Sequence, residues 1–192
     1  MEGSNELGIR LLHDKEHMLV ELKARVDNLH TIRKKLTGLG AQYVQTCRQI
    51  DLYFEVPKGW LKLREVEGES VAKLIYYERE KIAGPKRSAV YIVKIEKAEF
   101  LKVLLKKILQ TEIVVDKVRE IYQLEGTQIH LDSVKELGTF VEFERETSAD
   151  RDVSLRDLKV LEKLKGKLGI SSDNLERASY SDIILQTQYF NP

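Results

Sequence analysis

Apolar and charged residues alternate along much of this chain, with the period of two that is typical of β-strands. Between positions 19 and 26, apolar residues fill the even positions, whereas Glu21, Lys23 and Arg25 fill odd ones. Comparable runs recur, and the short connections between most of them predict antiparallel neighbours. The pattern predicts strands at residues 19–26, 42–56, 60–66, 71–79, 88–94, 113–124, 127–132 and 139–146.

Helical spacing of apolar residues predicts three helices, at residues 29–39, 98–109 and 155–168. A further amphipathic turn or two is expected at 180–185, with a frayed end from 186 to 192. No linker rich in Pro or Gly divides the chain. We therefore expect an α+β protein with an N-terminal extension at 1–17, one domain at 18–185 and a C-terminal tail at 186–192.

The charged strand faces are compatible with two architectures. In an open antiparallel sheet packed on helices, the charged faces lie in water, which is the common arrangement. In a closed barrel with helices outside, they point inward, and each buried charge needs a counter-charge or a ligand. Carboxylates suit Mg2+ or Mn2+, and Lys and Arg suit phosphate oxygens. The second architecture would therefore hold the side chains that phosphoryl transfer needs.

Composition narrows the function without deciding it. The 192 residues include 32 Lys and Arg against 31 Asp and Glu, a net charge of +1, so neither nucleic-acid nor membrane-surface binding is expected. The single cysteine, Cys47, excludes an internal disulfide, and the first residues lack the features of a signal peptide, so a cytoplasmic protein is expected. No Gly-rich P-loop occurs, which argues against a Walker-type nucleotide site.

A series of short segments resembles the CYTH superfamily, the class IV adenylyl cyclases and thiamine triphosphatases among the triphosphate tunnel metalloenzymes. The order and spacing are most similar to the class IV cyclase-like branch, over about residues 19–180. The segments are 20–26 (VELKARV), 49–54 (QIDLYF), 61–65 (LKLRE), 77–79 (YER), 84–88 (GPKRS), 117–122 (KVREIY), 129–132 (IHLD) and 137–144 (LGTFVEFE). Each motif is weak alone, but their ordered series favours the closed barrel over the open sheet.

The resemblance implies a closed eight-stranded antiparallel β-barrel, the triphosphate tunnel, with flanking helices and one or two Mg2+ or Mn2+ ions. Glu21 and Lys23 match the second glutamate and the lysine of the family's ExExK signature. The implied metal ligands are Glu21, Asp132, Glu142 and Glu144. The implied phosphate contacts are Lys23, Lys62, Arg64, Arg79, Arg87, Lys94, Lys117 and Arg119. The residues expected to be catalytic are Glu21, Lys23, Arg64 and Glu142.

One position departs from the signature, because Leu19 stands where its first glutamate would be. The leading hypothesis is a metal-dependent phosphohydrolase acting on tripolyphosphate, a nucleoside triphosphate or thiamine triphosphate. The alternatives are an adenylyl cyclase that forms cyclic AMP and pyrophosphate, and a non-catalytic phosphate-binding module in which Leu19 has removed turnover. His130 shares a strand face with Asp132 and is a further candidate for the tunnel wall. The expected partner is a small molecule containing a triphosphate, and a homodimer is left open.

Overall fold

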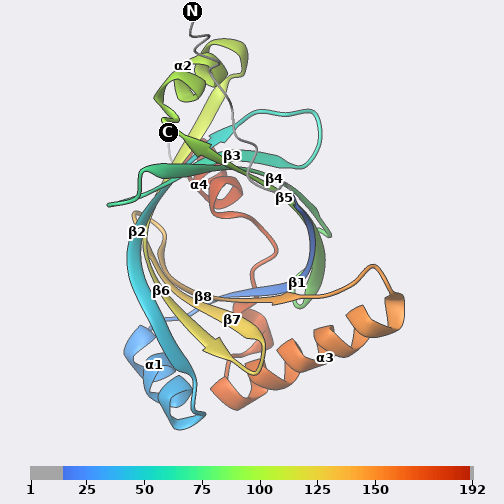
Figure 1. The fold of residues 1–192 in the computed structure, drawn as a ribbon. Helices are drawn as coiled ribbons and strands as arrows, with labels where there is room; N and C mark the ends of the chain where they lie inside the picture. Colours follow the sequence, from blue (N-terminus) through green and yellow to red (C-terminus); the bar gives the residue numbers. More distant parts are fainter. Residues whose placement is uncertain (1–14, 191–192) are drawn as a thin grey trace, which may run out of the picture.

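The strands of this chain close into a barrel, as the computed structural model of residues 15–190 shows (Figure 1). All eight neighbouring pairs are antiparallel, in the order β1-β5-β4-β3-β2-β6-β7-β8. The strands are β1 (Lys15–Arg25), β2 (Gln42–Phe54), β3 (Trp60–Val66), β4 (Val71–Arg79), β5 (Lys86–Glu96), β6 (Thr111–Leu124), β7 (Thr127–Val134) and β8 (Gly138–Glu146). The predicted closed barrel is therefore confirmed, and the open sheet is excluded.

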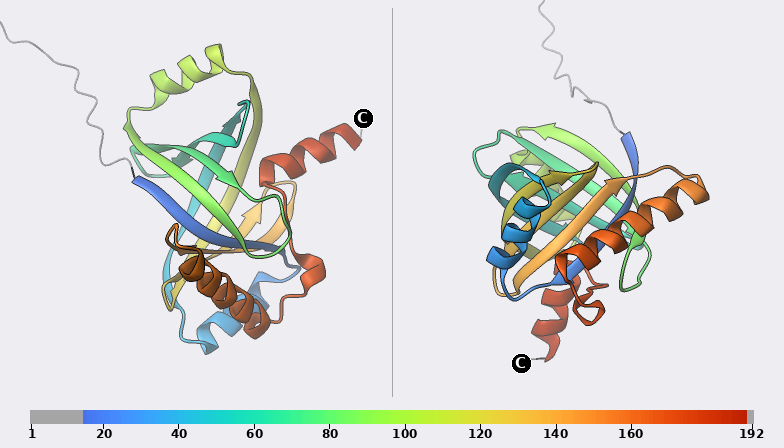
Figure 2. Two further views of the ribbon diagram at one scale, coloured as in Figure 1. Left: turned by 90° about the vertical axis from the view of Figure 1, so that its right-hand side faces the viewer. Right: turned by 90° about the horizontal axis from the view of Figure 1, so that it is seen from below.

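Four α-helices and one 3-10 turn accompany the barrel. They are α1 (Leu29–Gly38), α2 (Glu99–Ile108), α3 (Arg151–Leu168), η1 (Ser172–Asn174) and α4 (Tyr180–Phe190). Figures 1 and 2 show α2 on one side of the barrel and α1 and α3 on the opposite side. None of the helices between residues 15 and 190 is both long and apolar enough to cross a membrane.

Most element boundaries lie within a few residues of the expected ones, and two differences concern the ends of the described chain. Strand β1 begins at Lys15, inside the expected 1–17 extension, because Lys15 already pairs with Ile92 of β5. The frayed end expected from 186 onward is wrong as far as residue 190, since α4 continues to Phe190. Tyr180 and Ile184 in its first turns are buried against the barrel, and a helix anchored at its start extends with little further cost. Residues 191–192 lie outside the described part.

The outer apolar faces of the strands are buried by the helices. On β1, the even-numbered Val20, Leu22 and Ala24 share one core cluster with Leu36 of α1 and Leu161 of α3. Burying apolar surface is the main favourable term in folding, so this outer layer stabilises the barrel. The odd positions of the same strand are consequently directed inward. Because the helices cover the apolar faces on the outside, the alternating charged residues of the strands lie inside the barrel.

A tight turn joins β2 to β3 at the segment Pro57-Lys58-Gly59. Gly59 has a φ of +70°, and a Cβ at this position would lie 2.7 Å from the carbonyl oxygen of Tyr77. Only glycine is compatible with both constraints. This turn fixes the β2–β3 register in which Asp51 faces Arg64 and Tyr53 faces Lys62.

The outer core should respond strongly to truncation of Leu161, which is completely buried on α3. Leu161→Ala removes packed methyl groups and leaves a cavity, so we expect the free energy of unfolding to fall by about 2–5 kcal/mol. Leu155→Ala is the matched control, because Leu155 lies on the same helix with 40% of its surface exposed. Urea titration measures both changes, and equal losses would contradict the packing described.

Candidate active site

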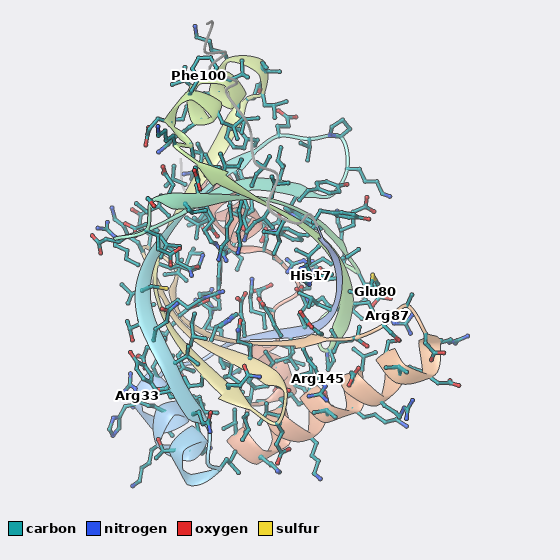
Figure 3. The ribbon with its side chains drawn as sticks, in the orientation of Figure 1. His17, Arg33, Glu80, Arg87, Phe100 and Arg145 are labelled. Carbon is teal, nitrogen blue, oxygen red and sulfur yellow. The ribbon has the colours of Figure 1, made fainter. Side chains whose placement is uncertain are left out.

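A cavity lies inside the barrel and is lined by side chains from β1, β2, β3, β4, β5, β6, β8 and the start of α4. Figure 3 shows side chains entering the ring of strands from all around it. Six basic side chains face three carboxylates across this space. They are Lys23, Lys62, Arg64, Arg79, Lys117 and Arg119, opposite Glu21, Glu142 and Glu144. The excess of positive charge makes the cavity a site for an anion.

The basic wall is organised around one carboxylate, Asp51 of β2, which is completely buried. Arg64 of β3 donates to it through Nε at 2.6 Å and Nη2 at 2.7 Å. Lys62 Nζ lies 3.2 Å from its Oδ2, and Lys117 Nζ of β6 lies 2.8 Å from the same oxygen. One carboxylate of β2 is therefore shared by three basic side chains from two other strands, β3 and β6.

This sharing sets the pKa values of the group. Burial alone would raise the pKa of Asp51, but Arg64, Lys117 and Lys62 hold that pKa well below its ordinary value. Burial and the neighbouring Arg64 lower the pKa of Lys62 to about 7, although Asp51 opposes the change. Burial likewise lowers the pKa of Lys117 to about 8, against the attraction of Asp51. An anion that added negative charge here would favour the protonated form of both lysines.

A second ionic cluster connects β1, β6, β7 and β8. Arg119 donates to Asp132 Oδ1 at 2.7 Å and to Oδ2 at 2.6 Å, and its Nη2 also donates to Glu142. Lys23 Nζ lies 2.9 Å from Glu142 Oε1. Burial tends to raise the pKa of Glu142, but Lys23 and Arg119 hold that pKa well below its ordinary value. Glu142 is therefore a carboxylate at neutral pH.

Two glutamates oppose each other in the β1–β8 pair, because Glu21 is the register partner of Glu144. Like charges directly opposite on neighbouring strands are destabilising unless a cation lies between them. Arg79 of β4 partly compensates, with its Nη1 2.9 Å from Glu21 Oε1. Ligand atoms of His130, Glu142 and Glu144 all lie within 4.8 Å of one another.

Several buried polar atoms in the cavity wall, or beside its carboxylates, have no hydrogen-bond partner among residues 15–190. They include Arg79 Nε and Nη2, Ser88 Oγ and His130 Nδ1. Buried polar groups are normally satisfied, so such atoms indicate sites where a ligand or water binds. The Arg79 guanidinium and the Ser88 hydroxyl can donate to an anion. His130 Nδ1 beside two carboxylates instead fits a divalent cation, for which imidazole and carboxylate are suitable ligands.

Most of the residues expected from the sequence are brought together by the fold. Nine of them line the cavity, namely Glu21, Lys23, Lys62, Arg64, Arg79, Lys117, Arg119, Glu142 and Glu144.

Three expected residues lie elsewhere or are otherwise occupied. Arg87 faces Val20 on the outer side of the β1–β5 pair and is outside the ring of strands in Figure 3. Lys94 is exposed near the end of β5 and is not part of the cavity lining. Asp132 is completely buried, and its two oxygens accept from Arg119 and from the Tyr180 hydroxyl, so it holds Arg119 in place.

Comparison with known proteins places this architecture. Residues 17–180 match the family profile described as the CYTH domain. The chain belongs to the CYTH family. It is also 31% identical, over 176 residues, to a candidate adenylate cyclase of Methanocaldococcus jannaschii, an alignment that covers 85% of this chain and 97% of that protein.

Solved structures share the CYTH barrel at lower sequence identity. A protein of Pyrococcus horikoshii OT3 superposes with a TM-score of 0.76 at 24% identity, covering 88% of this chain and 98% of its own. A Hippeastrum protein named as an adenylyl cyclase superposes with a TM-score of 0.61 at 16% identity, covering 90% and 96% of the two chains. At these identities, the likeness establishes the fold.

Sequence reasoning missed three groups of residues in or beside this CYTH cavity. Asp51 shares strand parity with the cavity-lining Tyr53 and faces Arg64 across the β2–β3 hairpin, so the alternation of the QIDLYF segment contained a usable signal. Lys86 is the second missed group. It is completely buried and donates to the carbonyl oxygens of Ile82 at 3.0 Å and Glu176 at 3.2 Å. Ser179 and Tyr180 come from the segment entering α4, where no strand periodicity marks them.

Loss of the Asp51 charge should destabilise the protein. Asp51→Asn leaves Lys62, Arg64 and Lys117 without their shared carboxylate, and breaking a buried ionic group in this way costs about 3–5 kcal/mol. We also expect tripolyphosphate to raise the melting temperature of the variant more than that of the parent, since the anion replaces the missing negative charge. Thermal unfolding with and without tripolyphosphate measures both effects.

Asp116→Asn is the control, because Asp116 forms a similar two-bond pair with Arg48 on the exposed outer side of the barrel. Exposed pairs contribute little, so this variant should unfold close to the parent. Equal stability of Asp51→Asn and the parent would contradict the shared-charge description.

The lowered lysine pKa values predict proton uptake when a polyanion binds. At pH 8, Lys62, with a pKa of about 7, is mostly neutral, and Lys117, with a pKa of about 8, is half protonated. Bound negative charge raises both pKa values, so tripolyphosphate binding should take up about one proton from solution. Near pH 6 both lysines are already protonated, and this uptake should shrink.

Calorimetric titration at pH 8 in two buffers of different ionisation enthalpy gives the number of protons exchanged. Lys62→Met should lower the uptake by about half or more, while any proton exchange of tripolyphosphate itself is common to both proteins. An unchanged uptake in this variant would contradict the assignment.

Proposed function

We propose that this CYTH protein hydrolyses the phosphoanhydride bond of a triphosphate, with Mg2+ or Mn2+, inside the barrel. The observation that carries the proposal is the division of one cavity into a basic wall and a wall of carboxylates, two of which lie beside His130. Inorganic tripolyphosphate, a nucleoside triphosphate and thiamine triphosphate are the candidate substrates.

The basic wall supports binding of several adjacent phosphates. Among residues 15–190, the ion pairs of Lys62, Arg64 and Lys117 are all with Asp51, so a polyanion would relieve their mutual repulsion. Arg79 adds two guanidinium nitrogens without partners among the described residues. Arginine forks match the geometry of phosphate oxygens, and lysines act as point charges.

The carboxylate wall supports a divalent cation. Glu21, Glu142 and Glu144 would hold it, with His130 Nδ1 as a further ligand, because these groups include the opposed β1–β8 pair and the unpartnered imidazole nitrogen. When bound, the cation would polarise a phosphoryl oxygen or lower the pKa of a water molecule. Asp132 is left out of this set because, unlike Glu21, Glu142 and Glu144, it is not part of the cavity lining.

The chain's own residues would orient the substrate and neutralise charge. Displacement at phosphorus depends chiefly on positioning and electrostatic stabilisation. Lys23 and Arg119 both contact Glu142, so they are located where the basic and carboxylate walls meet. There they would bind the oxygens of the phosphate under attack, while Lys62, Arg64 and Lys117 stabilise the charge that develops on the departing phosphate.

Adenylyl cyclase activity is the second candidate, because the relative of Methanocaldococcus jannaschii carries that name at 31% identity. The same cavity would then present the ribose 3′-hydroxyl rather than water as the nucleophile. The Hippeastrum protein is named as an adenylyl cyclase and has a dominant triphosphatase activity, so in that protein the name does not fix the reaction. A third candidate is a phosphate-binding module, favoured by Leu19 in the cavity wall at the position of the first signature glutamate.

One set of incubations separates the three functions. The protein is incubated with Mg2+ or Mn2+ and, separately, with tripolyphosphate, ATP or thiamine triphosphate. Release of inorganic phosphate supports hydrolysis, and cyclic AMP with pyrophosphate supports the cyclase. Thermal stabilisation by these ligands without any product would contradict both enzymatic proposals and support the binding module.

The metal assignment predicts a large effect of Glu144→Gln. This change removes a charged ligand. Loss of a residue that only hydrogen-bonds to a metal ligand lowers activity about 10-fold to 100-fold. We expect the loss of metal-dependent turnover in Glu144→Gln to be at least as large. Folding should be little affected, because Glu144 is partly exposed and its one ion-pair contact is with His130. Initial rates over a series of metal concentrations give the result.

Glu146→Gln is the matched control. Glu146 is the next residue on the same face of β8, but its side chain is 79% exposed and lies beside His17. Its turnover should equal that of the parent. If Glu144→Gln and Glu146→Gln were equally active, the proposed metal set would be wrong.

A further inference from the structure

Tyr180 reaches the cavity from α4, an element that carries none of the charged strand motifs. Its side chain is almost completely buried and forms part of the cavity wall. Its hydroxyl donates to Asp132 Oδ2 at 2.7 Å, and its ring packs edge-on against Phe140 at 4.9 Å. The ring and the hydroxyl therefore contact different parts of the site.

The ring of Tyr180 contacts the lysine of the signature. Lys23 Nζ lies 3.8 Å from the ring centroid, and Lys117 Nζ lies 5.9 Å from it. An ammonium group over an aromatic face is attracted by the ring quadrupole, and more strongly where water is excluded. The backbone carbonyl of Ala178 also accepts from Lys23 Nζ at 3.4 Å. Without these contacts, the close ion pair with Glu142 would alone determine the position of Lys23.

The hydroxyl of Tyr180 acts on Arg119 through Asp132. Asp132 accepts two hydrogen bonds from Arg119 and a third from Tyr180. Burial, together with Asp132 and Glu142, raises the pKa of Tyr180 well above its ordinary value, so the phenol keeps its proton and remains a donor. A third donor draws part of the carboxylate charge away from Arg119. The guanidinium then retains more of its charge for a phosphate oxygen.

The segment before and after Tyr180 is held by three strands. The amide of Glu176 donates to the Lys23 carbonyl at 2.9 Å, and Lys86 of β5 donates to the Glu176 carbonyl. On the other side, Asp182 accepts from Trp60 Nε1 of β3 at 3.2 Å and from the Ser179 amide at 2.8 Å. These bonds fix the start of α4 relative to the cavity.

We propose that Tyr180 is a positioning residue of the phosphate site, which sets Lys23 through its ring and Arg119 through its hydroxyl and Asp132. The proposal rests on the proposed function only in taking the cavity as the site of a triphosphate. The C-terminal segment is then part of the active site rather than a support for the barrel.

The test compares Tyr180→Leu, Tyr180→Phe and Tyr122→Phe with the parent. Tyr180→Leu removes both contacts, whereas Tyr180→Phe keeps the ring and removes only the hydroxyl. Tyr122→Phe is the matched control, because Tyr122 is equally buried and donates to a carboxylate, Glu120, in the outer core away from the cavity. Calorimetric titration with tripolyphosphate, without added metal, measures affinity, and thermal unfolding measures stability.

We expect Tyr180→Leu to bind tripolyphosphate about 10-fold more weakly than the parent and Tyr180→Phe about 3-fold more weakly, with Tyr122→Phe unchanged. Partial recovery in Tyr180→Phe would show the separate share of the ring. If the Tyr180 variants lost only stability and the folded protein bound as tightly as the parent, the residue would be merely structural and the proposal would be wrong.

Binding and turnover report on different proposals. If the parent binds tripolyphosphate but hydrolyses none of the three triphosphates with Mg2+ or Mn2+, the proposed reaction is wrong, yet the variants still decide the role of Tyr180. If the parent does not bind tripolyphosphate, the role of Tyr180 in a phosphate site is wrong, whereas the incubations with metal, ATP and thiamine triphosphate still decide the reaction.

Discussion

The sharing of one buried carboxylate by three basic side chains is the constraint on which the interior of this barrel depends. Asp51 neutralises only part of the charge of Lys62, Arg64 and Lys117. Removing such charges from water is expensive, and incomplete pairing leaves part of that expense uncompensated. The outer apolar layer under α1 and α3 has to supply the missing stability. The protein thus holds a preformed positive site, which the proposed polyanion would complete.

The opposite wall has the complementary imbalance. Glu21 faces Glu144 across β1 and β8, and Glu142 is held ionised by Lys23 and Arg119. If acidic and basic side chains alternated evenly around the cavity, they would all form ion pairs with one another and leave no unpaired charge for a ligand. Separation of the excess positive and excess negative charge to different strands instead suits an anion and a cation bound together. The near-zero net charge of the chain therefore conceals a strongly divided interior.

The barrel and most of its lining could be predicted because strand parity is a local property of the sequence. The alternation around Glu21 and Lys23 identifies their face directly, and the family resemblance indicates that this face points inward. Arg87 shows where this kind of prediction fails. A shift of one residue moves a side chain to the opposite face of a strand, and the sequence of the turn before β5 does not determine which residues of β5 point inward. Tyr180 was missed for another reason. Its place in the cavity depends on the long path from α3 to α4, which no local pattern encodes.

Leu19 constrains where the proposed cation site can lie, because it stands at the position of the first signature glutamate. It is directed into the cavity, where its register partners are Ser88 of β5 and Glu146 of β8. Glu146 cannot readily replace the missing carboxylate, since its side chain is exposed and lies beside His17. The proposed cation site must therefore be built on the inner side of Leu19, where Glu142 and Glu144 meet the unpartnered nitrogen of His130. An imidazole ligand in place of a carboxylate lowers the negative charge of the proposed ligand set, which favours one bound cation over two.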